Sequence, residues 1–282
     1  DTIAYHLPTI VTWMQADRFA LYTPFNDQPI AYYPYGWEAL CSLFLILGKS
    51  DGFVLLCNCA SAVLLGLGVF QVARSIGAAR YASICATCLL LSMPIFLYNI
   101  GTLHTDLPMA TFFIISLLYM ILLIKGQNFR HLALLPTGIG LLCASKPSGI
   151  AYSALLLSGC FLFFVKYRLQ IWHNFNRTSM ILILISVGIA ISTGGYWLIR
   201  NWNIIGNPFG FLDIKIGPLV IFSGSMNADF IRRTSLAGLF SFYEREHLRI
   251  LASSAYHYLH LPFLALVLFF IFSLMLGVYL HK

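Results

Sequence analysis

Long apolar runs separated by short polar turns dominate the sequence. Seven of these runs occur, at 52–73, 81–100, 107–124, 132–146, 148–165, 179–199 and 258–280. A helix needs about 20 apolar residues to cross the hydrocarbon core of a bilayer, and fewer suffice where the membrane is locally thin. The pattern therefore predicts an all-α membrane protein, a bundle of about seven transmembrane helices.

Basic residues gather on alternate turns, and this predicts the orientation of the spans. If residues 1–50 lie outside, the inside turns contain no acidic residue and the basic residues Arg74, Arg80, Lys125, Arg130, Lys166, Arg168, Arg177 and Lys282. The 10 acidic residues then all lie outside. Cytoplasmic turns of membrane proteins carry this excess of Lys and Arg. Reading 132–165 as one long helix would break the pattern, so we predict two short spans there.

The predicted spans divide the chain into four parts. These are a first outer loop at 1–50, a six-span bundle at 51–199, a long outer loop at 200–257 and a final span within 258–282. The first loop contains an amphipathic stretch from His6 to Met14 and an apolar stretch at 37–48. Both are too short to cross a bilayer, so we expect interfacial or re-entrant helices. Because the chain starts at Asp1 without a signal peptide, we interpret it as part of a longer protein.

Composition supports the membrane prediction and excludes several functions. Hydrophobic residues make up 59% of the chain and charged residues 10%, whereas a soluble domain has about 25% charged residues. The net charge of +7 is spread over short turns rather than gathered in a patch, so we expect no nucleic-acid partner. The sequence lacks a Walker loop, a His-Glu-x-x-His metal motif and a Gly-x-Ser-x-Gly nucleophile elbow.

Two aspartates on outer loops are candidates for chemistry. Asp106 lies in the turn directly before the span at 107–124 and two residues before Pro108. It can cap that helix, and a carboxylate fixed at a helix start is also a well-placed base or ligand. Asp1 is either a solvated loop carboxylate or a second such group, and the residues by themselves leave both readings open.

Two outer cations complement these acids. Lys146 lies at the break between two short spans, and such breaks occur where the backbone lines protein or a wet cavity. The alternative is that its side chain extends to the lipid headgroups. Arg200 follows the span at 179–199, where its guanidinium could bind a phosphate through two hydrogen bonds. The alternative is an interfacial arginine between Trp197 and Trp202.

Four motifs in order resemble the outer-face segments of one enzyme superfamily. Asp1-x-x-x-Tyr5-His6-Leu7-Pro8 before Trp13, followed by Tyr33-Pro34-x-Gly36-x-Glu38, resembles the first outer loop of polyprenyl-phosphate-sugar-dependent glycosyltransferases of the GT-C superfamily. The nearest group is related to protein O-mannosyltransferases and to lipid A aminoarabinose transferase. Asp106 resembles the aspartate of their second outer loop. Segments 145–149 and 200–208, which contain Lys146, Arg200 and Asn207, are also similar.

The resemblance implies an inverting sugar transfer from a polyprenyl-phosphate donor to an acceptor hydroxyl on a glycan, lipid or protein. Asp1 would be the base, and Asp106 would position a substrate or hold a divalent metal where one is used; no cofactor is firmly implied. On charge grounds, Lys146 and Arg200 would neutralise the phosphate as it leaves. Weaker candidates for substrate contacts are Tyr5, His6, Tyr33, Glu38, His104 and Asn207. The implied location is a bacterial inner membrane, with the site facing the periplasm or exterior.

A secondary transporter or lipid flippase is the main alternative. Transport sites lie near the membrane midplane on broken helices and often contain buried acids. No acidic residue lies in the middle of a predicted span, and only Lys146 at a helix break favours transport. The sequence therefore favours the glycosyltransferase.

Overall fold

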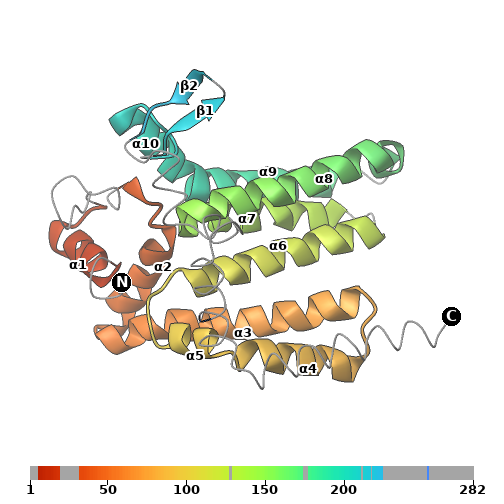
Figure 1. Cartoon of the computed structure of the whole chain (residues 1–282), viewed down its shortest axis with the longest axis horizontal. Coiled ribbons are helices and arrows are strands. Elements are labelled where there is room, and N and C mark those ends of the chain that lie inside the picture. Colours follow the sequence, from red (N-terminus) through yellow and green to blue (C-terminus); the bar gives the residue numbers. More distant parts are fainter. Residues whose placement is uncertain are drawn as a thin grey trace.

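The computed structural model describes residues 6–19, 32–126, 129–173, 177–210, 212–216, 218–224 and 253. These residues form a bundle of long helices in which the chain runs back and forth, and α1 and α2 lie across one end (Figure 1). We call this end, which also carries residues 101–105 and Lys146, the α2 end. It contains almost all of the described candidate site residues.

The two short helices of the first loop form where the amphipathic and apolar stretches predict them. Helix α1 covers Leu7–Ala16 and α2 covers Gly36–Gly48. Each ends at a residue in the left-handed region, with φ of 50° at Asp17 and 49° at Lys49. Helix α3, Asp51–Ser75, starts directly afterwards, and the Ser50 hydroxyl accepts a hydrogen bond from Gly52 N. This tight connection fixes α2 against the start of the bundle.

The predicted span at 81–100 is not one continuous helix, because the chain bends there by 67°. Helix α4 covers Arg80–Leu91 and α5 covers Pro94–Ile100. Proline has no backbone N–H, and its ring disfavours helical geometry in the residue before it. Met93 accordingly has an extended backbone with ψ of 132°. Pro94 therefore begins a new helix instead of continuing α4.

The next three helices lie side by side and follow the predicted spans. They are α6 over Asp106–Gly126, α7 over Phe129–Ser145 and α8 over Pro147–His173. Lys146 is the only non-helical residue between α7 and α8. The predicted helix break at this position is therefore confirmed, whereas two spans on either side of it are not. It turns the chain back at the α2 end, so that Lys146 lies beside the start of α6 (Figure 1).

The last long helix of the described residues extends further than the sequence predicts. Helix α9, Arg177–Ala190, passes through a π-helical turn η3 at Ile191–Gly195 into α10, Tyr196–Ile205. It ends at Gly206, whose φ of 69° suits a glycine at a helix end. We expected the outer loop to start at residue 200, whereas Arg200 is helical. A short antiparallel hairpin follows, with β1 at Ile214–Ile216 and β2 at Leu219–Phe222.

The structure confirms a predominantly helical membrane protein but does not show seven spans. Three described helices are long and apolar enough to cross a membrane, over Gly52–Ser75, Asp106–Lys125 and Arg177–Ile205, and the bent α4–α5 pair is a fourth if counted as one span. The apolar parts of α7 and α8 are shorter. The predicted span at 258–280 lies outside the described residues. Exposed apolar side chains such as Leu155, Phe161 and Leu184 suit a lipid-facing surface.

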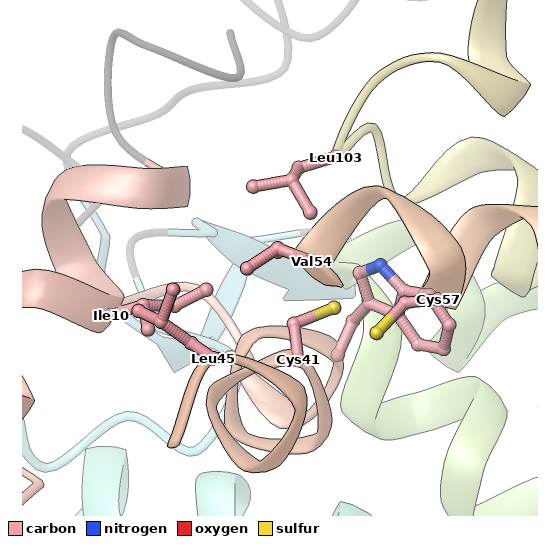
Figure 2. Packing of buried hydrophobic residues seen from close by; sticks show 7 residues of the cluster. Ile10, Cys41, Leu45, Val54, Cys57 and Leu103 are labelled. Carbon is pink, nitrogen blue, oxygen red and sulfur yellow. The ribbon is translucent and has the colours of Figure 1, made fainter. Parts of the chain in front are cut away.

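A buried apolar cluster joins the helices of the α2 end. Its members are Ile10, Trp37, Cys41, Leu45, Val54, Cys57 and Leu103. Figure 2 shows that side chains from α1, α2, α3 and the turn before α6 meet there. Cys41 and Cys57 are free thiols, and a buried free cysteine packs as a small hydrophobic residue. The cluster holds the first loop and the turn before α6 in one packed unit.

Gly149→Ala is expected to separate α7 from α8. A Cβ atom at Gly149 would lie 2.0 Å from the Leu142 carbonyl oxygen, so the two helices would have to move apart. We expect a loss of about 1–3 kcal/mol in the free energy of unfolding, the usual cost of overpacking. Unfolding in detergent would measure it. Gly188→Ala is the matched control because nothing lies within 4 Å of its Cβ position. Equal stability of both variants would contradict the close packing.

Candidate active site

Residues from four distant segments, most of them with polar side chains, line a pocket of about 10 Å³ at the α2 end. The segments are the start of α1, residues 33–38, the turn before α6 and the α7–α8 break. The lining residues are His6, Tyr33, Pro34, Tyr35, Glu38, Thr105, Ser145 and Lys146. Four of them, His6, Tyr33, Glu38 and Lys146, are predicted site residues. We call this feature the polar pocket.

Asp106 and Lys146 form an ion pair at the edge of the polar pocket. The Lys146 Nζ atom donates to Asp106 Oδ1 over 2.6 Å, and the side chains are 38% and 48% exposed, respectively. Asp106 is the first residue of α6, where the partial positive charge of the helix start favours a carboxylate. A pair this exposed contributes little to stability, about 0–1 kcal/mol. A charged ligand can therefore reach either side chain and replace its partner in the pair.

His6 and Glu38 form a second pair, which is deeply buried. His6 Nδ1 contacts Glu38 Oε1, and each side chain is 3% exposed. The other carboxylate oxygen, Glu38 Oε2, is buried and has no hydrogen-bond partner among the described residues. A buried unpaired oxygen is unfavourable by about 1–3 kcal/mol, more if charged. This oxygen belongs to a residue that lines the polar pocket and is available to accept a hydrogen bond.

His104 extends this group of polar side chains. Its ring centroid lies 6.3 Å from that of His6 and 5.8 Å from that of Tyr98. Burial lowers the pKa of His104 below its usual value, and the nearby His6 acts in the same direction. Burial also raises the pKa of Tyr35 far above its usual value. Both groups are therefore neutral around pH 7 and can act as hydrogen-bonding groups.

The depressed pKa of His104 predicts a pH dependence of stability. As the pH falls below the ordinary value of 6.5, the unfolded chain binds the proton before the folded protein does. The stabilising contribution of neutral His104 is thus present above pH 6.5 and is lost as the pH falls through its folded-state pKa. Between the ordinary and the folded-state pKa of His104, the free energy of unfolding of the wild type should fall more steeply with decreasing pH than that of His104→Gln. The free energy of unfolding would be measured in detergent at several pH values. Parallel plots of this free energy against pH for the two proteins would contradict the prediction.

Arg200 on α10 holds the segment that forms one wall of the pocket. Its Nη2 atom donates to the Tyr33 carbonyl over 3.1 Å, and its guanidinium lies 4.8 Å from the centroid of a Trp197 ring. The adjacent Asn201 Nδ2 donates to the Tyr32 carbonyl over 2.9 Å. Sequence reasoning missed Asn201, although it directly follows Arg200 in the recognised motif. Together the two side chains connect the last long helix to the first loop.

An apolar groove lies beside Trp197 and next to this arginine. Its volume is about 310 Å³, and it is lined mainly by Phe19, Gly36, Ala39, Leu141, Ala144 and Trp197. The π-helical turn η3 contributes Ser192 and Thr193. The groove therefore lies between α2, α7 and the last long helix. Because Trp197 is close to Arg200, an apolar surface and a cation lie next to each other here.

The remaining predicted residues lie elsewhere. Asn207 is buried, its Nδ2 donates to the carbonyls of Leu212 and Ser223, and its Oδ1 accepts from Phe209 N. These bonds organise the base of the hairpin, so its substrate contact stays a prediction. Asp1 and Tyr5 lie outside the described residues. The structure also brings Thr105 and Ser145 into the pocket, which their spacing in the sequence does not reveal.

The positions of the acidic and other metal-ligating side chains bear on two alternatives, a metal site and a transport site. Within the described ranges, no group of three or more His, Cys, Asp or Glu side chains is arranged to hold a metal ion. The described acids Asp17, Glu38, Asp51, Asp106 and Asp213 lie in loops or near helix ends. The geometry is thus that of a site at one end of the bundle, formed by loops and helix starts.

Comparison with known proteins supplies the family. The family described as dolichyl-phosphate-mannose-protein mannosyltransferase matches residues 33–211, which is more than half of the 282 residues. The match includes the segment at 33–38, the turn before α6, the α7–α8 break and Arg200. Searches of curated proteins and of solved structures found no match. The chain therefore belongs to the dolichyl-phosphate-mannose-protein mannosyltransferase family and is a membrane glycosyltransferase of the GT-C type.

Proposed function

We propose that the polar pocket is the site of an inverting sugar transfer from a polyprenyl-phosphate donor to an acceptor hydroxyl. The observation that carries this proposal is the exposed Asp106–Lys146 pair at the pocket edge. Inversion requires the acceptor oxygen to attack the anomeric carbon from the side opposite to the leaving phosphate. A carboxylate on the acceptor side and a cation on the phosphate side can serve that reaction once the bound substrates separate the pair.

The acidic groups act on the acceptor side. The resemblance assigns the base to Asp1, which lies outside the described residues, and it would take the proton from the acceptor hydroxyl as the oxygen attacks. Asp106 positions the acceptor or donor from the fixed first position of α6. Glu38 Oε2, which is buried without a partner among the described residues, would accept a hydrogen bond from a substrate hydroxyl. The same role is proposed for His6, Tyr5, Tyr33, His104 and Asn207.

The cationic groups act on the donor side. The bond from the anomeric carbon to the phosphate oxygen breaks, and negative charge grows on the departing polyprenyl phosphate. Lys146 and Arg200 would stabilise that charge. Lys146 is paired with Asp106, whose exposed carboxylate a phosphate can replace. Arg200 donates to the Tyr33 carbonyl, so it lies against the pocket wall.

The apolar groove beside Trp197 suits the prenyl chain of this donor. An amphiphile with an anionic head needs an apolar surface next to a cation, and the groove and Arg200 provide both. The acceptor would be a glycan, lipid or protein. The alternating charges support an orientation with the α2 end outside, and the resemblance implies a bacterial inner membrane with this end facing the periplasm. The division at residues 51, 200 and 258 into loops and spans is retained as part of this proposal.

A donor comparison tests the function. The full-length protein in liposomes would be given radiolabelled sugars on polyprenyl monophosphate or on nucleotides, together with a cell-envelope acceptor extract. We expect label to move to the acceptor from the lipid monophosphate only, with inversion at the anomeric carbon. Failure of every lipid-linked donor with folded protein, or transfer from the nucleotide sugars instead, would contradict the proposal.

A further inference from the structure

A buried amide on α3 holds the turn that leads into α6. The Asn58 Nδ2 group donates to the backbone carbonyls of Asn99 over 2.8 Å, Thr102 over 2.7 Å and His104 over 3.2 Å. Asn58 itself is 0% exposed. The last of these carbonyls lies two residues before Asp106. One side chain therefore connects the turn before α6, which is one of the four segments that line the polar pocket, to α3.

The turn needs an internal donor because it lies inside the bundle. Helix α5 ends at Ile100, and the last carbonyls of a helix have no partner within the helix. The turn that follows is buried at two positions, since Leu103 is 2% exposed and Thr105 is 6% exposed. Buried backbone carbonyls away from water require a hydrogen bond. Asn58 supplies it to the part-buried carbonyls of Thr102 and His104 and adds to the bonds that Asn99 accepts from Thr102.

The donors of Asn58 explain why an amide occupies this position. Its Oδ1 atom is buried without a hydrogen-bond partner in the described part of the chain. Such an unpaired acceptor is unfavourable, and asparagine is a weaker helix former than leucine. An apolar residue would therefore suit the long apolar helix α3 better if packing were the only requirement. The benefit of Asn58 comes from its two N–H groups and the turn that they bind.

We propose that Asn58 is a positioning residue for the transfer site. By holding residues 99–104, it sets the place where α6 begins and hence the place where Asp106 meets Lys146. The same bonds keep His104 against His6. A shift of about 1 Å in a reacting group can lower a rate by roughly a hundredfold. Only this kinetic consequence rests on the proposed function; the constraint on the turn does not.

Two variants of the full-length protein test the role of the donors. Asn58→Leu removes them, and Asn58→Asp keeps the shape while replacing the NH₂ group by oxygen. We expect the amides of residues 99–105 to exchange hydrogen roughly tenfold faster or more, with the rest of the bundle unchanged. In the transfer assay, kcat should fall roughly tenfold or more while KM for the lipid donor stays within about twofold.

Ser83→Ala is the matched control. Ser83 is also 0% exposed, but its hydroxyl donates only to the Ala79 carbonyl at the start of the same helix. This variant should leave both exchange in the turn and kcat unchanged. Equal changes in this control would show a general response of the bundle and would overturn the proposal.

The outcomes separate this inference from the proposed function. Unchanged exchange at 99–105, faster exchange spread over the whole bundle, or failure of both variants to fold would each overturn the role of Asn58 in the turn. A looser turn with unchanged kcat would overturn its positioning role. If the turn loosens but the wild type transfers no sugar from any lipid donor, the constraint stands and the proposed function fails.

Discussion

Asp106→Asn is expected to lower the rate of sugar transfer by roughly a hundred- to a thousandfold, the usual loss for a group that acts on the transition state. Asparagine keeps the shape but removes the charge that Lys146 contacts over 2.6 Å. Because the pair is half-exposed, stability should change by about 0–1 kcal/mol. Initial rates in liposomes, together with unfolding in detergent, would measure the two effects.

Asp213→Asn is the matched control for this loss. Asp213 also pairs with a lysine over 2.6 Å, but the partner is Lys215 in the hairpin. The Asp213 side chain is 10% exposed and does not line the polar pocket, so its replacement should leave transfer within about twofold of the wild type. Transfer by Asp106→Asn at nearly the wild-type rate would remove Asp106 from the site. An equal loss in both variants would indicate a general effect of negative charge rather than a positioned carboxylate.

The largest effect on stability is expected from His6→Leu. This variant removes the contact between His6 and Glu38 Oε1. The buried Glu38 carboxylate then loses this partner as well, because its Oε2 atom already has none among the described residues. Leaving a buried carboxylate without its hydrogen-bond partner typically costs about 3 kcal/mol or more. The free energy of unfolding in detergent should fall by that amount. A loss of about 1 kcal/mol or less would show that the pair is not buried as described.

The double variant His6→Leu/Glu38→Leu separates stability from function. Replacing both members of a buried pair by apolar residues is often neutral or stabilising, so most of the lost stability should return. Sugar transfer should not return, because the pocket would still lack the free carboxylate oxygen. A stable double variant with wild-type transfer would restrict both residues to a structural role. Continued instability would instead point to contacts of His6 beyond Glu38.

The differences from the predicted helices have local physical causes. The apolar run at 81–100 contains Pro94, which divides it into two helices because proline lacks a backbone N–H and restricts the residue before it. The charge of Arg200 predicts the end of the last described span, because charge normally marks a membrane boundary. In the structure, the helix continues to Gly206, where a left-handed φ ends it. Glycine at that position was the better signal for the helix end.

The sequence by itself determined the helical class, most helix positions and the charged residues worth testing. These features depend on local quantities, namely the length of apolar runs, the charge of short turns and the residues at helix ends. Only the tertiary structure decided which charges meet. Asp106 pairs with Lys146 across 40 positions, His6 with Glu38 across 32, and Arg200 with Tyr33 across 167. Such contacts depend on which helices pack against one another, and hydrophobic periodicity does not specify those pairings.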